Sequence, residues 1–301
     1  VKSRRITPNA THNAPDRANR SAELMLLKNQ SAAAGIIIPT PRREAINPII
    51  EKMSLKRIFD PFLPILFLFL LKCNKKVYNG GMLYFDAHCH LMEDDVFLRA
   101  QSRGVAAFIV NTTRPDEWEK VADLNKRMTG IYFCAGAHPW FVNELPADWE
   151  NQMAAFLEKY PMAMIGEIGL DKTRPFFDRQ MQVFEGCLKL AERYNRKIHI
   201  HCVKAWDELI EILIQYHGIK TLFHRFAGDE FIIQKLKIFN PYFSILNGRY
   251  APIIPDNRLL VETDSPDGLK TPSAIPALVE ALELDADYLN QTFQDFLDES
   301  I

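Results

Sequence analysis

Cysteine is scarce in this chain, which contains five cysteines among 301 residues. Their number is odd, they are scattered, and no two of them form a CxxC pair. This pattern is typical of free thiols in a reducing compartment and argues against a disulfide framework. We therefore expect a cytoplasmic protein.

A hydrophobic run long enough to cross a membrane is also missing. The stretch PFLPILFLFLL at residues 61–71 is about half of the roughly 20 apolar residues that a membrane-spanning helix needs. Basic residues flank it, as they flank the core of a signal peptide, but no small-residue cleavage site follows. A membrane-associated protein held by residues 61–71 is the alternative to a cytoplasmic one.

The net charge is small, at −2, but its distribution divides the chain. Residues 1–81 contain 14 Lys or Arg and 5 Asp or Glu, a formal charge of +9, whereas residues 82–301 contain 22 and 33, a charge of −11. We expect residues 1–81 to be a disordered basic extension and residues 82–301 to be a folded domain. Because the chain opens with valine and Met82 precedes the first predicted strand, we interpret the extension as a start-site artefact.

Short apolar, β-branched runs recur through residues 82–301, and amphipathic segments with helical spacing separate most of them. The predicted strands span residues 83–90, 106–113, 131–138, 163–170, 197–202, 221–226, 242–246 and 259–263. The clearest predicted helices span residues 116–128, 147–160, 177–195 and 205–216. Strands that alternate with helices in this way predict a parallel sheet closed into an α/β barrel, the (β/α)8 TIM barrel.

The seventh helix of this barrel is expected to be missing or reduced to a single turn. Only residues 251–258 separate Tyr250 from the last predicted strand, and Pro252 and Pro255 interrupt them. The predicted fold is therefore a TIM barrel shortened around helix 7.

Side chains that can bind a metal follow the predicted strands at one end of the barrel. The first strand ends in YFDAHCHL, where alternation places His88 and His90 on one face. Other strand ends contribute Glu167 in IGEIGLD, His201 in KIHIHC, His224 in TLFHRFAG and Asp264 in LLVETDSPDG. Because the carboxyl ends of the strands of such a barrel meet at one rim, these six side chains are predicted to converge.

Six nitrogen and oxygen ligands are too many for one tetrahedral ion and suit two divalent metal ions, with Zn, Mn or Mg as candidates. Two ions about 3.5–4 Å apart can clamp the attacking and leaving oxygens of a hydrolysed ester. Glu167 is the expected bridging carboxylate. Asp264 is the expected group that holds the nucleophilic water and accepts its proton.

Four further residues are expected to support this site. Asp86 and His199 lie one layer deeper in the predicted barrel than the ligands on their strands, so we expect them to orient ligands rather than to bind metal. His138, after the third strand, is predicted to contact the substrate or a ligand. Arg225 is either a substrate phosphate contact or a solvated surface charge.

These motifs resemble those of the TatD family of metal-dependent deoxyribonucleases, within the amidohydrolase-like barrels. The similar segments are FDAHCHL at 85–91, GAHPW at 136–140, IGEIGLD at 165–171, residues 179–202, LFHRFAG at 222–228 and LLVETDSP at 259–266. The resemblance implies one ion held by His88, His90, Glu167 and Asp264, and a second held by Glu167, His201 and His224. It also implies hydrolysis of phosphodiester bonds, typically by exonuclease action on DNA.

Several features depart from the family pattern and keep other substrates open. Where family members carry an Arg- and Asn-containing loop after the last strand, this chain has only Lys270, and Arg225 replaces the cysteine of the family's HCFSG. A charge of −11 also repels a long polyanion, because phosphate contacts supply most nonspecific affinity. Short oligonucleotides or small phosphoesters are therefore alternative substrates.

Two further functions are compatible with such a barrel. A hydrolase of carbon esters or amides would share the HxH motif, but a bridging lysine would then be expected on the fourth strand, where this chain has Glu167. A degenerate, non-catalytic barrel would fit the missing helix but not the intact ligand set. We expect a monomeric enzyme whose substrate is nucleic acid or a short oligonucleotide, with no stable protein partner.

Overall fold

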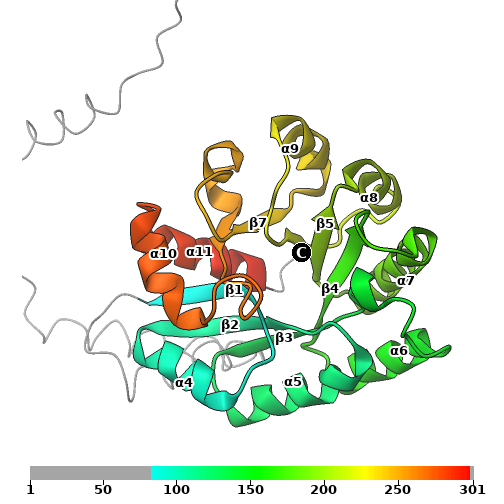
Figure 1. Cartoon of the computed structure of the whole chain (residues 1–301), viewed down its shortest axis with the longest axis horizontal. Helices are drawn as coiled ribbons and strands as arrows, with labels where there is room; N and C mark the ends of the chain where they lie inside the picture. Colours follow the sequence, from blue (N-terminus) through cyan, green and yellow to red (C-terminus); the bar gives the residue numbers. More distant parts are fainter. Residues whose placement is uncertain (1–82, 299–301) are drawn as a thin grey trace, which may run out of the picture. The chain divides into compact units, whose positions relative to one another are not determined.

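The structure is a computed structural model that describes residues 83–298. Eight parallel strands are paired in the order in which they occur along the chain. They are β1 Tyr84–His90, β2 Val105–Asn111, β3 Ile131–Ala135, β4 Met164–Asp171, β5 Ile198–Val203, β6 Thr221–Phe223, β7 Tyr242–Ile245 and β8 Leu259–Val261. Helices surround the strands (Figure 1), so the predicted (β/α)8 barrel is confirmed.

The α-helices bury one apolar stripe each against the sheet. In α7, Phe177–Tyr194, the buried residues Val183 and Cys187 are one helical turn apart, and Asn195 ends the helix in the left-handed conformation. The remaining α-helices are α4 Asp94–Ser102, α5 Pro115–Arg127, α6 Trp149–Lys159, α8 Trp206–Leu213, α9 Glu230–Leu236, α10 Ile275–Ala281 and α11 Ala286–Leu297. Short 3-10 helices are η2 Pro139–Phe141, η3 Lys237–Phe239, η4 Ala251–Ile253, η5 Asp256–Arg258 and η6 Pro272–Ala274.

The connection between β7 and β8 confirms the expected loss of helix 7. It contains only the two 3-10 helices η4 and η5. Pro252 lies within η4, and Pro255 stands between the two short helices. Because proline lacks an amide proton and clashes with the preceding turn, a longer helix cannot form across this segment.

The barrel closes at a seam between its first and last strands. The backbone N–H of Asp264 donates to the carbonyl of His88 at 2.8 Å, and the N–H of His90 donates to the carbonyl of Ser265, also at 2.8 Å. Below these bonds, the carboxylate of Asp86 accepts hydrogen bonds from the backbone N–H and the hydroxyl of Thr263. The seam therefore joins segments that carry predicted metal ligands.

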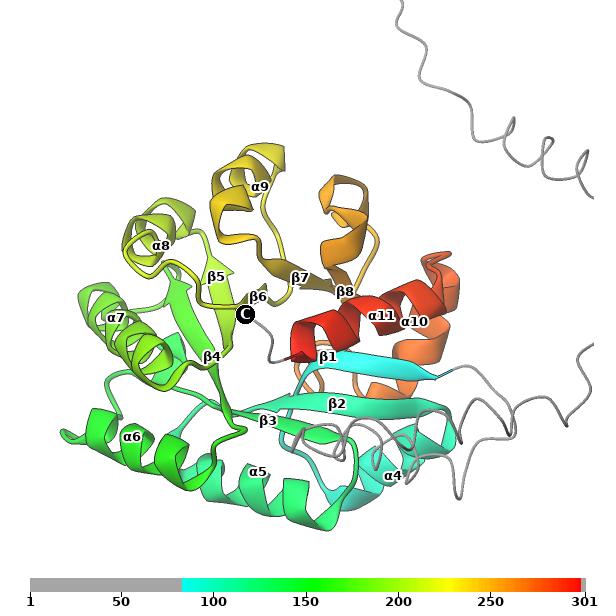
Figure 2. The same cartoon turned by 180° about the vertical axis from the view of Figure 1, so that it is seen from behind.

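Helix α11 covers one end of the barrel, next to β1 (Figures 1 and 2). Its Phe293 ring stacks on Phe85 of β1 with ring centroids 4.5 Å apart. Its Phe296 ring lies 5.2 Å from the ring of Tyr242 on β7. Both phenylalanines are buried in the cluster that fills the barrel interior, so the polar site is left to the opposite end.

Five strands end earlier than the sequence predicts. The predictions extended β2 to residue 113, β3 to 138 and β7 to 246, whereas the structure ends these strands at residues 111, 135 and 245. The prediction also extended β6 to residue 226 and β8 to residue 263, whereas the structure ends them at Phe223 and Val261. Arg225 and Asp264 have positive φ values of 42° and 49°, which turn the chain off the sheet. His224 and Asp264 therefore stand on the first turns beyond their strands.

Some expectations concern a part of the chain that the structure does not describe. They are the disordered extension 1–81, the apolar run 61–71 and the start at Met82, all of which lie outside residues 83–298. Within the described range, every helix is too short or too polar to cross a membrane.

Candidate metal centre and active site

A glycine directly after β3 and a glycine on β4 let the strands of the site approach closely. A Cβ atom at Gly169 would lie 1.9 Å from the carbonyl oxygen of His201, and φ at Gly169 is +142°. A Cβ atom at Gly136 would lie 1.6 Å from the carbonyl oxygen of Thr112. Only glycine fits these two positions. The glycines of the IGEIGLD and GAHPW motifs thus allow β4, which carries Glu167, to lie close to the neighbouring strands.

The carboxylate of Glu167 lies at the centre of the site and is buried. Its Oε1 atom is 2.7 Å from Nε2 of His224 and 2.8 Å from Nδ1 of His201. Nε2 of His138 lies 3.0 Å from the same oxygen. Three imidazoles from three different strand ends therefore face one oxygen of Glu167.

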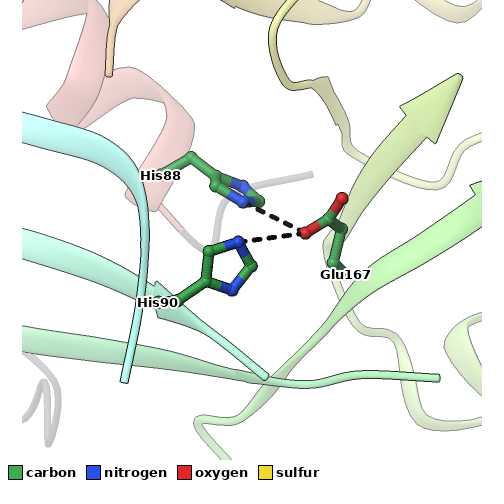
Figure 3. A group of neighbouring side chains, drawn as sticks. All are labelled: His88, His90 and Glu167. Atoms are coloured by element: carbon green, nitrogen blue, oxygen red, sulfur yellow. Dashed lines mark ion pairs between the residues drawn. The ribbon is translucent and has the colours of Figure 1, made fainter. Parts of the chain in front are cut away.

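The other oxygen of Glu167 faces the two histidines of β1 (Figure 3). Nε2 of His88 and Nε2 of His90 each lie 3.4 Å from Oε2 of Glu167. Oδ1 of Asp264 is 3.1 Å from Nε2 of His90 and 3.8 Å from Nε2 of His88. The two oxygens of Glu167 thus face different donors, Oε2 the histidines of β1 and Oε1 His138, His201 and His224.

His201 and His224 each have a carboxylate on the far side of the ring. Nε2 of His201 lies 3.7 Å from Oδ2 of Asp171, and Nδ1 of His224 lies 3.7 Å from Oε1 of Glu262. The same Oδ2 of Asp171 accepts a hydrogen bond from the indole N–H of Trp140 at 2.7 Å. Metal-binding histidines commonly face a carboxylate through their second nitrogen, which fixes the orientation of the ring.

These two carboxylates received no role in the sequence analysis, although spacing could have indicated them. Asp171 is four residues after Glu167 on β4, and Glu262 is two residues before Asp264. In an extended chain both separations place the side chains on the same face. Glu262 is also fixed from behind, because it accepts hydrogen bonds from the Ser244 hydroxyl and from the backbone N–H of Arg225.

The hydrogen bonds of His138 assign its tautomer. Its Nδ1 atom accepts a hydrogen bond from the backbone N–H of Trp140 at 3.2 Å, so Nδ1 carries no proton. Burial lowers the pKa of His138 to about 4, although the nearby Glu167 opposes this shift. The ring is therefore neutral at pH 7, with its proton on Nε2 and directed at Glu167. His138 thus contacts Glu167, a predicted ligand, and its contact with a substrate stays a prediction.

Asp86 and His199 lie below the ligands, as predicted. Asp86 contacts the backbone N–H of His88 and both donors of Thr263, so it acts on the chain beside Asp264 rather than on an imidazole ring. The His199 ring lies 5.9 Å from that of His88 and packs against Phe296. Its Nε2 atom is buried and forms no hydrogen bond within the described chain.

Arg225 reaches the site from the turn after β6. Its Nη1 atom donates a hydrogen bond to Oδ2 of Asp264 at 2.8 Å. The Arg225 side chain is 49% exposed, whereas that of Asp264 is only 4% exposed. The guanidinium therefore covers the solvent side of Asp264.

The electrostatics of the cluster fit a cation between its imidazoles and carboxylates. Burial alone would raise the pKa of Glu167, but the surrounding histidines, His224 first among them, together outweigh burial, and the pKa of Glu167 lies well below its usual value. Burial alone would lower the pKa of His224, but Glu167 and Glu262 together outweigh burial and hold the pKa of His224 well above the ordinary value. Without a metal, a proton on His224 balances the carboxylate.

A buried nitrogen atom without a hydrogen bond supports the same conclusion. Nε2 of His88 faces Oε2 of Glu167, is buried, and forms no hydrogen bond within residues 83–298. An unsatisfied buried nitrogen is costly, and a coordinated ion would satisfy it. His88, His90 and Glu167 offer ligand atoms within 4.8 Å of one another, as do His88, His224 and Asp264. The donor set fits divalent metal ions.

Comparison with known proteins decides between the families that share this barrel. The profile of the family described as "TatD related DNase" matches residues 85–294. The chain belongs to the TatD family. The match covers all eight strands and every predicted metal ligand, and TatD proteins are metal-dependent hydrolases of the deoxyribonuclease type.

Similar proteins are identical to this TatD protein at about a quarter of the aligned residues. "Deoxyribonuclease TATDN3" of Homo sapiens is 28% identical, over 62% of this chain and 79% of the relative. "3'-5' ssDNA/RNA exonuclease TatD" of Citrobacter koseri is 26% identical, over 58% of this chain and 72% of the relative. The crystal structure of YjjV, a TatD homologue of Escherichia coli, superposes with a TM-score of 0.64 at 24% identity, covering 71% of this chain and 95% of that one. The last comparison supports the fold.

Proposed function

We propose that this TatD protein is a two-metal phosphodiesterase that releases nucleotides from the end of single-stranded nucleic acid. The arrangement around Glu167 supports this proposal most directly. Each carboxylate oxygen faces a separate group of imidazoles, which is the geometry required of a carboxylate that bridges two ions. The relative from Citrobacter koseri is named a 3'-5' exonuclease of single-stranded DNA and RNA, which makes this substrate class the first to test.

Two divalent ions would be held by the residues that surround Glu167. His88, His90 and Asp264 would bind the first ion, His201 and His224 the second, and Glu167 would bridge them. When bound, such ions polarise a phosphodiester and lower the pKa of the attacking water. Because Asp171 and Glu262 face the outer nitrogens of His201 and His224, they would keep the inner nitrogens directed at Glu167.

Asp264 would accept the proton of the attacking water. Its Oδ1 atom faces His90 and His88, and its Oδ2 atom faces Arg225. A general base must reach the water directly or through one intervening water. When a substrate phosphate draws the half-exposed Arg225 guanidinium away, Oδ2 becomes free to take the proton.

His138 would donate a hydrogen bond rather than coordinate an ion. Its protonated Nε2 is directed at Oε1 of Glu167, 3.0 Å away. A phosphate oxygen bound beside Glu167 would lie within reach of the same N–H group. His138 and Arg225 would then contact the transferred phosphate from opposite sides of the metal centre, as donors that complement its developing charge.

The decisive experiment follows Mn²⁺- or Mg²⁺-dependent release of mononucleotides from end-labelled single-stranded DNA. Wild-type protein should release them, and Glu167→Ala should reduce the rate by about a thousandfold or more, because both ions lose their shared ligand. Glu211→Ala, which removes an exposed carboxylate on α8, is the matched control and should keep wild-type activity. Release that is unaffected by Glu167→Ala would overturn the proposal.

A second candidate, a hydrolase of small phosphoesters, is favoured by the charge of −11 on residues 82–301. The same metal centre would serve it. Wild-type protein that binds two ions and hydrolyses a small phosphodiester, but leaves single-stranded DNA intact, would select this candidate over the exonuclease.

A further inference from the structure

A groove of about 460 Å³ lies on the same rim of the barrel as the metal centre. Its walls come from the turns that follow β4, β5, β6 and β7, and α8 and α9 flank it as neighbours on the outside of the barrel (Figures 1 and 2). Lys172, directly after Asp171, and Lys204, three residues after His201, both line it. The groove therefore starts next to residues that face the proposed ligands of the second ion.

Basic residues follow four successive strands on this part of the rim. Lys172 comes after β4, Lys204 after β5, Arg225 after β6 and Arg249 after β7. The loop after β8, in contrast, contains only Lys270. The positive charge of the rim is thus concentrated over β4 to β7, in a domain whose total charge is −11.

The acidic residues of the groove are already engaged. Glu208 forms an ion pair with Lys172, and Asp207 forms one with Lys235 at 2.8 Å. Asp229 accepts a hydrogen bond from the backbone N–H of Ile232 and so caps α9.

Two cations of the groove, in contrast, have no acidic partner. Lys204 and Arg249 are exposed, and neither forms an ion pair with a carboxylate between residues 83 and 298. Lys204 also has a positive φ of 55°, an unfavourable conformation for lysine. An anion in the groove would meet two uncompensated positive charges.

Aromatic side chains form the remaining wall of the groove. The ring centroid of Trp206 lies 5.5 Å from that of Phe226, and the ring centroid of Tyr250 lies 6.0 Å from it, so both side chains pack against Phe226. The Arg249 guanidinium lies 5.3 Å from the ring of Tyr250. A positively charged groove with fixed aromatic residues is the usual surface that binds single-stranded nucleic acid.

We propose that this groove binds the strand of a single-stranded nucleic acid beyond the nucleotide that is released, with Lys204 and Arg249 each contacting a backbone phosphate. The inference rests on the proposed exonuclease function and adds to it a second site, outside the metal centre. It explains how an acidic domain that lacks the basic loop after β8 can hold a polyanion. The positive charge lies instead over β5 and β7.

The test compares the full-length wild-type protein with the double variant Lys204→Ala/Arg249→Ala. Binding of a fluorescently labelled single-stranded DNA is measured by anisotropy in EDTA, at several salt concentrations, so that cleavage does not intervene. The variant should bind about tenfold more weakly at low salt, and the slope of log affinity against log salt should fall by about 1.4, or about 0.7 for each lost phosphate contact. The control Lys120→Ala/Lys189→Ala removes two exposed lysines on α5 and α7 and should leave the slope unchanged.

Hydrolysis separates a failure of the groove from a failure of the proposed function. The p-nitrophenyl ester of thymidine monophosphate occupies the metal centre but has no further nucleotide to place in the groove. With Mn²⁺, Lys204→Ala/Arg249→Ala should hydrolyse this ester at the wild-type rate and raise the KM for single-stranded DNA. If the slope of log affinity against log salt is the same for the two double variants, the proposal that the groove binds nucleic acid is wrong. If wild-type protein hydrolyses neither substrate, the proposed function fails, and the binding slopes still decide whether the groove holds nucleic acid.

Discussion

The guanidinium of Arg225 donates a hydrogen bond to Oδ2 of Asp264 at 2.8 Å, on the face of Asp264 that is open to solvent. Arg225 stands where the family's HCFSG motif has cysteine, and a cysteine side chain is too short to make this contact. The substrate must therefore compete with Asp264 for Arg225, or bind beside the pair.

Replacing Arg225 should weaken substrate binding more than the chemical step. Arg225→Ala removes a cation from the mouth of the site, so we expect the KM for single-stranded DNA to rise about tenfold with a smaller change in kcat. Arg225→Lys should restore only part of the loss, because lysine cannot form the paired contacts of a guanidinium. Steady-state kinetics with Mn²⁺ measure both. An unchanged KM in Arg225→Ala would show that the side chain only covers Asp264.

Removing the carboxylates behind His201 and His224 should weaken metal binding. Asp171→Asn and Glu262→Gln keep the size of each side chain but remove the negative charge that faces His201 or His224. We expect the affinity for the second ion to fall about 10- to 100-fold, with little effect on the first. Titration with Mn²⁺ in competition with a chelator measures both constants. The surface variant Glu211→Gln should bind both ions as the wild type does. If Asp171→Asn and Glu262→Gln weaken the binding of both ions equally, these carboxylates do not act on the second ion in particular.

Asp86 should make the stability of the metal-free protein depend on pH. Burial raises the pKa of Asp86 from 3.8 to about 8, although hydrogen bonds from Thr263 oppose the shift. Between these two values the folded protein keeps a proton that the unfolded chain has lost, so this group lowers the free energy of unfolding as the pH rises from about 4 to about 8. Asp86→Asn does not titrate, so its stability relative to wild type should increase across this window and level off above it.

Urea unfolding in EDTA at a series of pH values tests this expectation. The exposed carboxylate of Asp287 on α11 provides the control, since Asp287→Asn should give a curve parallel to that of wild type. Parallel curves for Asp86→Asn and wild type would mean that Asp86 is ionised inside the barrel.

The conformation of Lys204 predicts opposite effects on stability and on binding. Glycine adopts a positive φ without the steric cost that lysine bears, so Lys204→Gly should raise the free energy of unfolding by up to about 1 kcal/mol. The same change removes a proposed phosphate contact and should weaken binding of single-stranded DNA. By comparison, Lys120→Gly in the middle of α5 should lower the free energy of unfolding by about 1 kcal/mol and leave the binding of single-stranded DNA unchanged. Lower stability of Lys204→Gly would contradict the strain at this position.

The barrel and its rim could be predicted because both depend on local sequence patterns. Strands such as β2 are continuous apolar runs, and amphipathic helices separate them, which together define a parallel sheet. A parallel barrel then brings all strand ends to one rim, so the convergence of residues as distant as His88 and Asp264 follows from topology. The missing helix 7 was also predictable, because Pro252 and Pro255 mark it in the sequence.

The spacing of Asp171 and Glu262 could indicate that they face the rim, but the contacts that they and the other partners make depend on distances between strands and could not be predicted. Whether Glu262 faces His224 or solvent is decided by how β6 and β8 lie relative to each other. The tautomer of His138 depends on a backbone N–H two residues further on, at Trp140. The pairing of Arg225 with Asp264 requires a positive φ at both residues, and no sequence pattern predicts these two turns. Such details arise from packing, after the strand order is fixed.

The seam of the barrel has a consequence for the synthesis of this protein on the ribosome. His90 and Asp264 are 174 positions apart in the chain, yet the backbone of each is joined to the opposite segment at the point where the His90 ring faces Asp264 and Glu167. A nascent chain that has not yet released β8 has neither Asp264 nor a closed barrel to align His88 and His90. We therefore expect hydrolytic activity to begin only after the last strand has docked.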